Sequence, residues 1–290
     1  MVRALLTERV RLAEAGASLV MREEKGKNRM LDKKLLLAAT LGLAAAAFSA
    51  APVFAEEQED EDFIPGDITG SVALTSDYSF RGVTQTDKGP ALQGSLEYAI
   101  DTGIAGTTAY AGFWGSNVDF NDGDEANLEI DILFGLRGAI GDTGLSWNLG
   151  GAYYAYPGAN KANGEHLNYD YWEIVTGLSY TVNDMVSLSG QYFYAPDFFG
   201  GTGKAHYFNG GVTVTPPIDI KPFGLSFYGN VGRQLIEDAQ DYTDWTIGAA
   251  VSYRFLKFSL AYVDTDLTQA DLGGNRLANG RVIATVSATF

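Results

Sequence analysis

The chain ends on the stretch VIATVSATF (residues 282–290), and this stretch decides the fold. Its apolar side chains occupy every second position, at Val282, Ala284, Val286, Ala288 and Phe290, with small polar residues between the last of them. Because successive side chains of a strand point to opposite faces, one face meets an apolar medium and the other a more polar one. A soluble chain rarely stops within a strand on an aromatic residue, since free termini fray. The ending therefore predicts a closing strand that must pair with a partner.

The N-terminal part of the chain predicts export. Lys33 and Lys34 precede an apolar core of about 14 residues, and Ala55 ends an A-x-A-like cleavage site. This core is shorter than the roughly 20 apolar residues of a membrane-spanning helix. We therefore expect residues 30–55 to be a signal peptide of the Sec pathway, and residues 1–29 to be an upstream extension that is absent from the natural protein. An unusually long basic region before the signal core is the alternative.

The mature chain is expected to begin at Glu56 and to be strongly acidic. Residues 1–55 hold 9 of the 20 Lys and Arg and 5 of the 36 Asp and Glu, which leaves 11 basic and 31 acidic residues, a net charge of −20. So acidic a protein is not expected to bind nucleic acid. The absence of Cys excludes disulfides, a lipid-modified Cys and thiol chemistry. Residues 56–66 carry six carboxylates and predict a disordered leader, followed by a single domain over 67–290.

Alternating segments continue through the whole of this domain. The clearest one has Leu128, Ile130, Ile132, Phe134 and Leu136 on one face and Glu129, Asp131 and Arg137 on the other. We count twelve such segments, and a strand number of 10 or 14 is the alternative. The segments lie approximately over residues 68–80, 92–100, 104–115, 128–137, 145–153, 172–180, 186–194, 208–214, 225–231, 245–254, 256–262 and 282–290. No segment of useful length after residue 55 has helical periodicity.

The connections between these segments alternate in length. Long polar links such as Pro157–Asp170 alternate with short ones such as Ala139–Asp142, and Pro216–Gly224 is the exception. Short turns on the periplasmic side and long loops outside are usual in outer-membrane barrels. The four Trp residues lie near segment ends, which predicts aromatic girdles at the membrane boundaries.

These patterns predict an all-β fold: a single transmembrane antiparallel up-and-down β-barrel of about 12 strands, after a cleaved signal peptide. Closure is required because an open sheet edge has no hydrogen-bond partners in hydrocarbon. A soluble two-sheet sandwich is the rival, but its outer face should be rich in charge. Here the polar faces are mostly Ser, Thr, Asn, Gly and Ala, which suits a lumen better. Phe290 is then the signal for the barrel-assembly machinery.

One motif near the first segment carries a family resemblance. The stretch TSDYSFRGVTQT (residues 75–86) resembles the TorF family of porins, a Gcw_chp-type group of bacterial outer-membrane β-barrel proteins. DWTIGA (244–249) and SLAYVDTD (259–266) are similar to late strands of that family. The resemblance covers roughly residues 67–290. It implies an integral protein of the bacterial outer membrane that is assigned as a porin, and it implies no particular solute.

The parity of the alternation selects candidate pore-lining residues. If the aliphatic side chains face lipid, Asp77, Glu129, Asp131 and Glu173 line the outer half of the lumen, and Glu97, Arg137, Arg254 and Lys257 line the periplasmic half. Charged walls in a narrow passage bias which ions enter. The hypothesis is passive diffusion of small polar solutes or cations. The alternative is that these charges pair across a filled barrel that does not conduct and acts structurally or in adhesion through its acidic loops.

The sequence supports two further classes of function, an enzyme and a metal-binding loop, less well than a pore. The stretch HYFNG (206–210) approaches the H-x-S-N-G of outer-membrane phospholipases but has Phe208 at the nucleophile position. His166 lies near Glu165 and Asp170 in a loop, but one such cluster in an acidic loop is expected without function, so we expect no enzyme. The acidic loop 119–125 offers carboxylates to a divalent cation but fails the EF-hand pattern. A solvated loop is the expectation, with a bound cation or a cation bridge to lipopolysaccharide phosphates as alternatives, so no metal or cofactor is assigned. Expected partners are membrane lipid and lipopolysaccharide, periplasmic chaperones, the barrel-assembly machinery and small solutes, with homo-oligomerisation left open.

Overall fold

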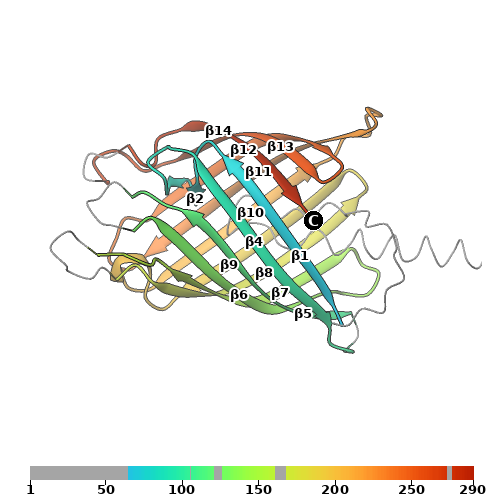
Figure 1. The fold of residues 1–290 in the computed structure, drawn as a ribbon, viewed down its shortest axis with the longest axis horizontal. Coiled ribbons are helices and arrows are strands. Elements are labelled where there is room, and N and C mark those ends of the chain that lie inside the picture. Colours follow the sequence, from blue (N-terminus) through green and yellow to red (C-terminus); the bar gives the residue numbers. More distant parts are fainter. Residues whose placement is uncertain (1–64, 105, 121–125, 161–167, 273–275) are drawn as a thin grey trace, which may run out of the picture.

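Twelve long strands form a closed antiparallel barrel in this computed structural model, which describes residues 65–104, 106–120, 126–160, 168–272 and 276–290 (Figure 1). The strands of the barrel are β1 (Asp67–Thr75), β4 (Ala91–Asp101), β5 (Thr107–Asn117), β6 (Leu128–Ala139), β7 (Leu145–Ala155), β8 (Tyr171–Asn183), β9 (Val186–Ala195), β10 (Ala205–Val214), β11 (Phe223–Ile236), β12 (Tyr242–Tyr253), β13 (Leu256–Thr265) and β14 (Arg281–Thr289). The predicted fold and strand number are confirmed.

The barrel closes where the first strand meets the last. β1 pairs with β14 in the register that sets Val72 opposite Ala288, and it pairs with β4 on its other side. Phe290 continues this pairing, because its N–H donates to the Gly70 carbonyl at 3.0 Å and its carbonyl accepts from the Gly70 N–H at 2.8 Å. Each wall strand is thus hydrogen-bonded on both sides, and no edge is left open.

Side chains alternate between the two faces of the wall, as the sequence predicts. On β6, Ile130 and Phe134 are exposed on the outside, whereas Glu129 and Asp131 are buried inside. Large aliphatic and aromatic side chains are exposed on strands all around the barrel. Those more than half exposed include Ile68, Leu92, Leu96, Leu178, Ile247, Leu260 and Val282. The apolar layer of this fold therefore faces outward, and the polar layer faces the lumen.

Long and short connections mostly lie at opposite ends of the barrel. The long ones, which include residues 76–90 and 196–204, gather at the left-hand end in Figure 1, and short turns such as residues 184–185 lie at the right. The eight-residue link 215–222 at the right-hand end is the exception that the sequence predicts. The end with the long connections is called the loop end below, and the other the turn end. Among the described residues no helix is long and apolar enough to cross a membrane.

The first segment differs from its prediction. Alternation from 68 to 80 suggested one strand with Tyr78 and Phe80 on its outer face, but β1 ends at Thr75 and the chain turns into the barrel. Tyr78 is 2% exposed and its ring lies 5.3 Å from that of Trp114, which also faces the lumen. Neither belongs to an outer girdle. Residues 1–64 lie outside the described residues, so the boundaries of extension, signal and leader stay predictions.

Candidate functional site: a constriction inside the barrel

A short hairpin in the first long connection folds into the lumen. It consists of β2 (Ser79–Phe80) and β3 (Val83–Thr84), joined by Arg81 and Gly82, both in the left-handed region with φ of 48° and 84°. Gly is required at 82, because a Cβ there would collide with Thr265 of β13 and Asp244 of β12. The backbone of the hairpin therefore lies against β12 and β13, the third and second strands from β1 around the wall.

Arg81 at the hairpin tip is lodged among wall residues. Its Nη2 donates to Glu173 Oε2 at 2.6 Å and its Nη1 to Gln234 Oε1 at 2.8 Å. The guanidinium carbon lies 4.3 Å from the ring centre of Tyr207 and 4.9 Å from that of Phe193. The side chains of Arg81 and Glu173 are 4% and 1% exposed. Arg81 is thus a fully enclosed cation with both a carboxylate and aromatic partners.

The base of the hairpin is tied to the wall by a second arginine. Arg281 at the start of β14 forms an ion pair with Asp77 and donates from Nη1 to the Gly82 carbonyl at 2.9 Å. The hydroxyls of Thr84 and Thr86 also donate to Asp77, the latter at 3.1 Å. Asp77 is 4% exposed and lies beyond the end of β1. It therefore anchors the hairpin, whereas the sequence placed it on the strand.

An aromatic cluster fills the space between the hairpin and the wall from β5 to β9. Tyr154 and Tyr171 stack at 4.4 Å, Phe80 meets Tyr154 at 6.0 Å, and Tyr78 packs on Trp114. Further buried members are Val118, Phe120, Tyr156, Tyr169 and small Ala residues. At the loop end the barrel thus contains a packed core of its own, which fixes the hairpin in the lumen.

Buried carboxylates of the wall face this core with incomplete partners. Glu129 Oε1 accepts from the Tyr156 hydroxyl at 3.1 Å, but Glu129 Oε2 and Asp131 Oδ1 have no hydrogen bond among the described residues. Asp244 accepts from Tyr207 at 3.2 Å through Oδ1, and its Oδ2 has no described partner. Carboxylates therefore outnumber guanidinium groups around the hairpin.

The phenol hydroxyls beside these carboxylates keep their protons. Burial raises the pKa of Tyr78 and Tyr156, two residues of the connections, well above the ordinary value, and the charge of Glu129 raises it further. Both hydroxyls therefore stay protonated at neutral pH. The hydroxyl of Tyr78 has no hydrogen-bond acceptor among the described residues.

The turn end of the lumen contains a separate ion pair. Arg137 Nη2 lies 2.7 Å from Glu97 Oε1, with the two side chains 10% and 13% exposed, and the guanidinium lies 5.0 Å from the ring centre of Tyr110. Lys257 is also on the lumen face, partly buried. The structure therefore brings Glu97 and Arg137 together and keeps them apart from the hairpin.

Of the residues selected from the sequence, Glu97, Glu129, Asp131, Arg137, Glu173 and Lys257 lie on the lumen face of their strands. Arg254 does not, because β12 ends at Tyr253 and Arg254 forms the exposed turn to β13. Sequence reasoning missed Arg81, Gln234 and Asp244. Asp244 follows from the parity of its strand, whereas nothing local to Arg81 predicts that its loop turns inward.

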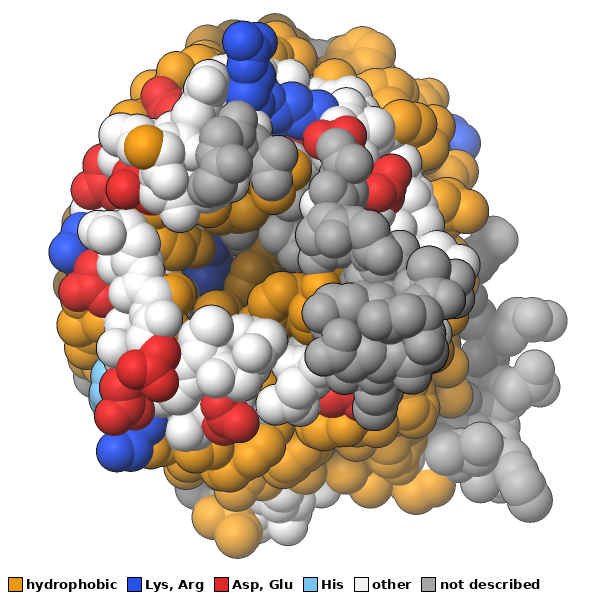
Figure 2. All heavy atoms as spheres, turned by 90° about the vertical axis from the view of Figure 1, so that its left-hand side faces the viewer, with side chains coloured by type: hydrophobic (Ala, Val, Ile, Leu, Met, Phe, Trp, Pro, Cys, Tyr) orange, Lys and Arg blue, Asp and Glu red, His pale blue; other side chains and the backbone are white. Residues whose placement is uncertain are grey.

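Figure 2 shows the loop end of the barrel. A hollow opens in its centre with basic side-chain atoms at depth, and acidic side chains lie on parts of the rim. Of the acidic loop 119–125, residues 121–125 lie outside the described residues, and so does His166. Within the described part of the chain, no group of three or more His, Cys, Asp and Glu side chains is arranged to hold a metal ion.

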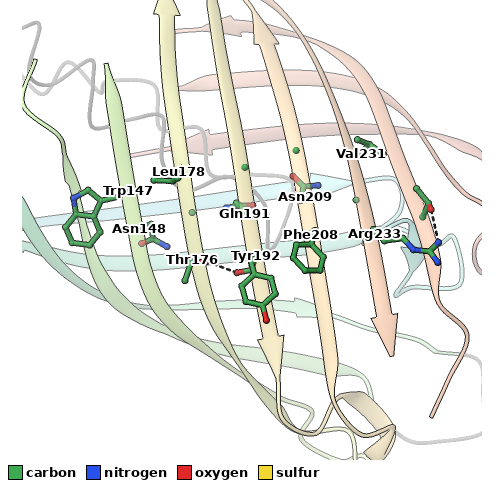
Figure 3. Close-up of a pocket in the computed structure, with 15 residues that line it drawn as sticks. Trp147, Asn148, Thr176, Leu178, Gln191, Tyr192, Phe208, Asn209, Val231 and Arg233 are labelled. Carbon is green, nitrogen blue, oxygen red and sulfur yellow. Dashed lines mark hydrogen bonds between the residues drawn. The ribbon is translucent and has the colours of Figure 1, made fainter. Parts of the chain in front are cut away.

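A groove is also present on the outer surface of the wall (Figure 3). Its floor includes the paired glycines Gly190 and Gly210, and Tyr192, Phe208 and Val231 stand beside them. The parity of β8 to β11 places these side chains on the face opposite to Glu173 and Gln234. This groove is therefore separate from the constriction in the lumen.

Residues 59–290 match the model of a family described as "Bacterial protein of unknown function (Gcw_chp)". No curated protein matches the sequence. Among solved structures, the chain is similar to a KdgM porin at 7% identity, with a TM-score of 0.42 over 77% of this chain and 97% of that one. It is also similar to a NanC porin (11% identity, TM-score 0.43, 77% and 99% covered) and to the COG4313 outer membrane channel from Pseudomonas putida F1 (12%, 0.44, 81% and 100%). The expected name TorF stays a prediction.

Proposed function

This chain belongs to the Gcw_chp family of bacterial proteins, and we propose that it is a channel of the bacterial outer membrane, with a lumen constricted by its own first loop. The closed wall supports the membrane location, because every backbone group of the strands can be paired without water. The outward layer of exposed aliphatic and aromatic side chains supports it as well, since such a surface is stable in lipid and not in water.

The permeating solutes that we propose are small polar molecules and cations. The observation that carries this proposal is the set of buried lumen carboxylates around the hairpin, which includes Glu129, Asp131 and Asp244 with unpaired oxygens. A negative wall in a narrow passage concentrates cations and excludes anions.

Planar-bilayer conductance of protein refolded from residues 56–290 tests this proposal. The variant Glu129→Gln combined with Asp131→Asn removes two lumen charges and should lower the potassium-to-chloride permeability ratio. Asp184→Asn is the matched control, because it removes the same kind of charge from an exposed turn. Anion selectivity in the wild type, or equal shifts in both variants, would contradict the proposal.

A non-conducting barrel that acts through its loops is the second candidate, because the aromatic cluster and the hairpin occupy much of the loop end. It predicts no conductance in the wild type or in any variant that releases the hairpin. A hydrolase is not proposed. His206 lies on the outer face, bonded to the Tyr192 hydroxyl at 2.8 Å, with Phe208 in the place of a nucleophile.

The proposal also covers how the protein is exported and inserted into the outer membrane. We propose export through the Sec pathway with cleavage after Ala55, delivery by periplasmic chaperones, and insertion by the barrel-assembly machinery through the segment that ends at Phe290. Lipid and lipopolysaccharide then surround the wall. A gel shift on heating would support a membrane barrel, since a soluble sandwich should show none.

A further inference from the structure

The surroundings of Arg81 have the composition of a receptor for a guanidinium group. A carboxylate from Glu173 and an amide oxygen from Gln234 accept from two different nitrogens of the same planar group. The rings of Phe193 and Tyr207 lie within 4.9 Å of its central carbon. A guanidinium is planar, so it can donate to acceptors at its edge while aromatic rings contact its face. An ammonium group is not planar and cannot use both kinds of contact in this way.

These four groups all belong to the barrel wall. Glu173 and Tyr207 have hydrogen-bond partners within the wall, whereas the described side-chain hydrogen bond of Gln234 is the one to Arg81. Glu173 also accepts from the Tyr154 hydroxyl at 3.0 Å. Tyr207 donates to Asp244 at 3.2 Å and accepts from Asn209 at 3.2 Å. They come from four adjacent strands, β8 to β11, that are joined by continuous pairing. The receptor is therefore part of a rigid wall, and its occupant arrives on a loop.

We propose that Glu173, Gln234, Phe193 and Tyr207 form a guanidinium-binding site in the lumen, in which Arg81 is the resident occupant and solutes that carry a guanidinium group are the competing ligands. The site itself requires only the folded barrel. The role of such solutes in transport rests on the proposed channel function. A solute that takes the place of Arg81 releases the hairpin tip from the wall.

A free guanidinium ligand competes with Arg81 for the site, and this competition sets the ligand concentration at which binding can be measured. Arg81 is held at the site by its own packed hairpin, so its effective concentration is at least of the millimolar order that a short flexible tether gives. A free ligand must exceed that level, or the resident group must be removed. Arg81→Ala removes it and leaves the four wall groups in place. Arg81→Lys is the matched control, because it keeps the positive charge without the planar group.

The test is a calorimetric titration of methylguanidinium, with methylammonium as reference, into the full-length barrel in detergent. Arg81→Ala should bind methylguanidinium saturably and about tenfold more tightly than methylammonium, since the smaller ion forfeits a charge-assisted hydrogen bond. The preference should be lost when Glu173→Gln is added to Arg81→Ala. Equal binding of the two ions, or binding that survives Glu173→Gln, would overturn the proposal.

A second measurement covers the case in which Arg81→Ala fails to fold, which heating of gel samples would reveal. In the wild type carrying Ser79→Cys, methylguanidinium should speed maleimide labelling of the hairpin, and methylammonium at equal ionic strength should not. No difference between the two ions would refute the site. Methylguanidinium binding together with zero conductance in every variant would leave the site standing and remove the channel function instead.

Discussion

The ion pair between Arg81 and Glu173 is predicted to hold the hairpin in the lumen, and its removal should expose the hairpin to reagents. The chain contains no Cys, so Ser79→Cys introduces a single thiol at the hairpin. The Ser79 hydroxyl is buried and makes no hydrogen bond among the described residues, so the substitution removes no described partner. The rate at which a membrane-impermeant maleimide labels Ser79→Cys then reports how often the hairpin leaves the lumen.

The size of the effect follows from the burial of the pair. At 2.6 Å, with side chains 4% and 1% exposed, Arg81 and Glu173 are both desolvated. Removal of one partner of a buried pair costs about 3–5 kcal/mol, because the other charge remains uncompensated. At 1.4 kcal/mol per factor of ten, Arg81→Ala should raise the labelling rate of Ser79→Cys roughly 100- to 4,000-fold, if opening is fast compared with labelling.

An exposed arginine on the outer face gives the matched control. Arg233 lies 3.7 Å from Asp266, with side chains 46% and 49% exposed, and such surface pairs contribute about 0–1 kcal/mol. Arg233→Ala should therefore change the labelling rate by at most about fivefold. Unchanged mobility of unheated samples would show that the barrel itself is intact. Similar labelling rates in the Arg81 and Arg233 variants would refute the reasoning.

Three other expectations concern the ends of the chain and the turn end of the lumen. Phe290→Ala should lower the fraction of heat-modifiable barrel, because the Phe290 ring covers Gly70 beside the closing hydrogen bonds, and wild-type yields in a refolding assay would contradict this. Glu97→Gln leaves Arg137 uncompensated and should shift the bilayer reversal potential toward chloride, whereas no shift would place the pair outside the ion path. Mass spectrometry of the exported protein should find Glu56 as its first residue, and any other start would refute the assigned cleavage site.

The wall could be predicted from the sequence because its two faces meet different media. Leu128 to Arg137 alternates except at Leu133, so the parity of each residue fixes its face, and Glu129 and Asp131 are inside as expected. Parity does not predict the face of a residue where the alternation is weak or where the strand has already ended. Alanine and glycine on both faces of β5 obscured the inward position of Trp114, and the turn after Tyr253 removed Arg254 from the lumen.

The constriction could not be predicted in the same way. Alternation continues through Tyr78 and Phe80, because a hairpin has the same period as the strand before it, so periodicity cannot show that the chain leaves the wall at Thr75. The partner of Arg81 is 92 residues away, and no local pattern encodes a pairing that exists only after the barrel has closed. The one sequence signal of the constriction is the many polar residues, with Gly82, between residues 75 and 86. This stretch carries the family resemblance, but the resemblance does not predict that it folds into the lumen.

Hairpin release and ion selectivity should be coupled, because Arg81 is both the fastening group and one of the few cations near Glu129, Asp131 and Asp244. When the hairpin leaves, the passage widens and at the same time loses a positive charge, so the negative potential of the wall increases. Arg81→Ala should therefore raise conductance and the potassium-to-chloride permeability ratio together. Arg81→Lys keeps the charge but forfeits the planar contacts, and it should raise conductance with a smaller change in selectivity. Higher conductance of Arg81→Ala with a shift toward chloride would mean that the lumen carboxylates do not control ion passage.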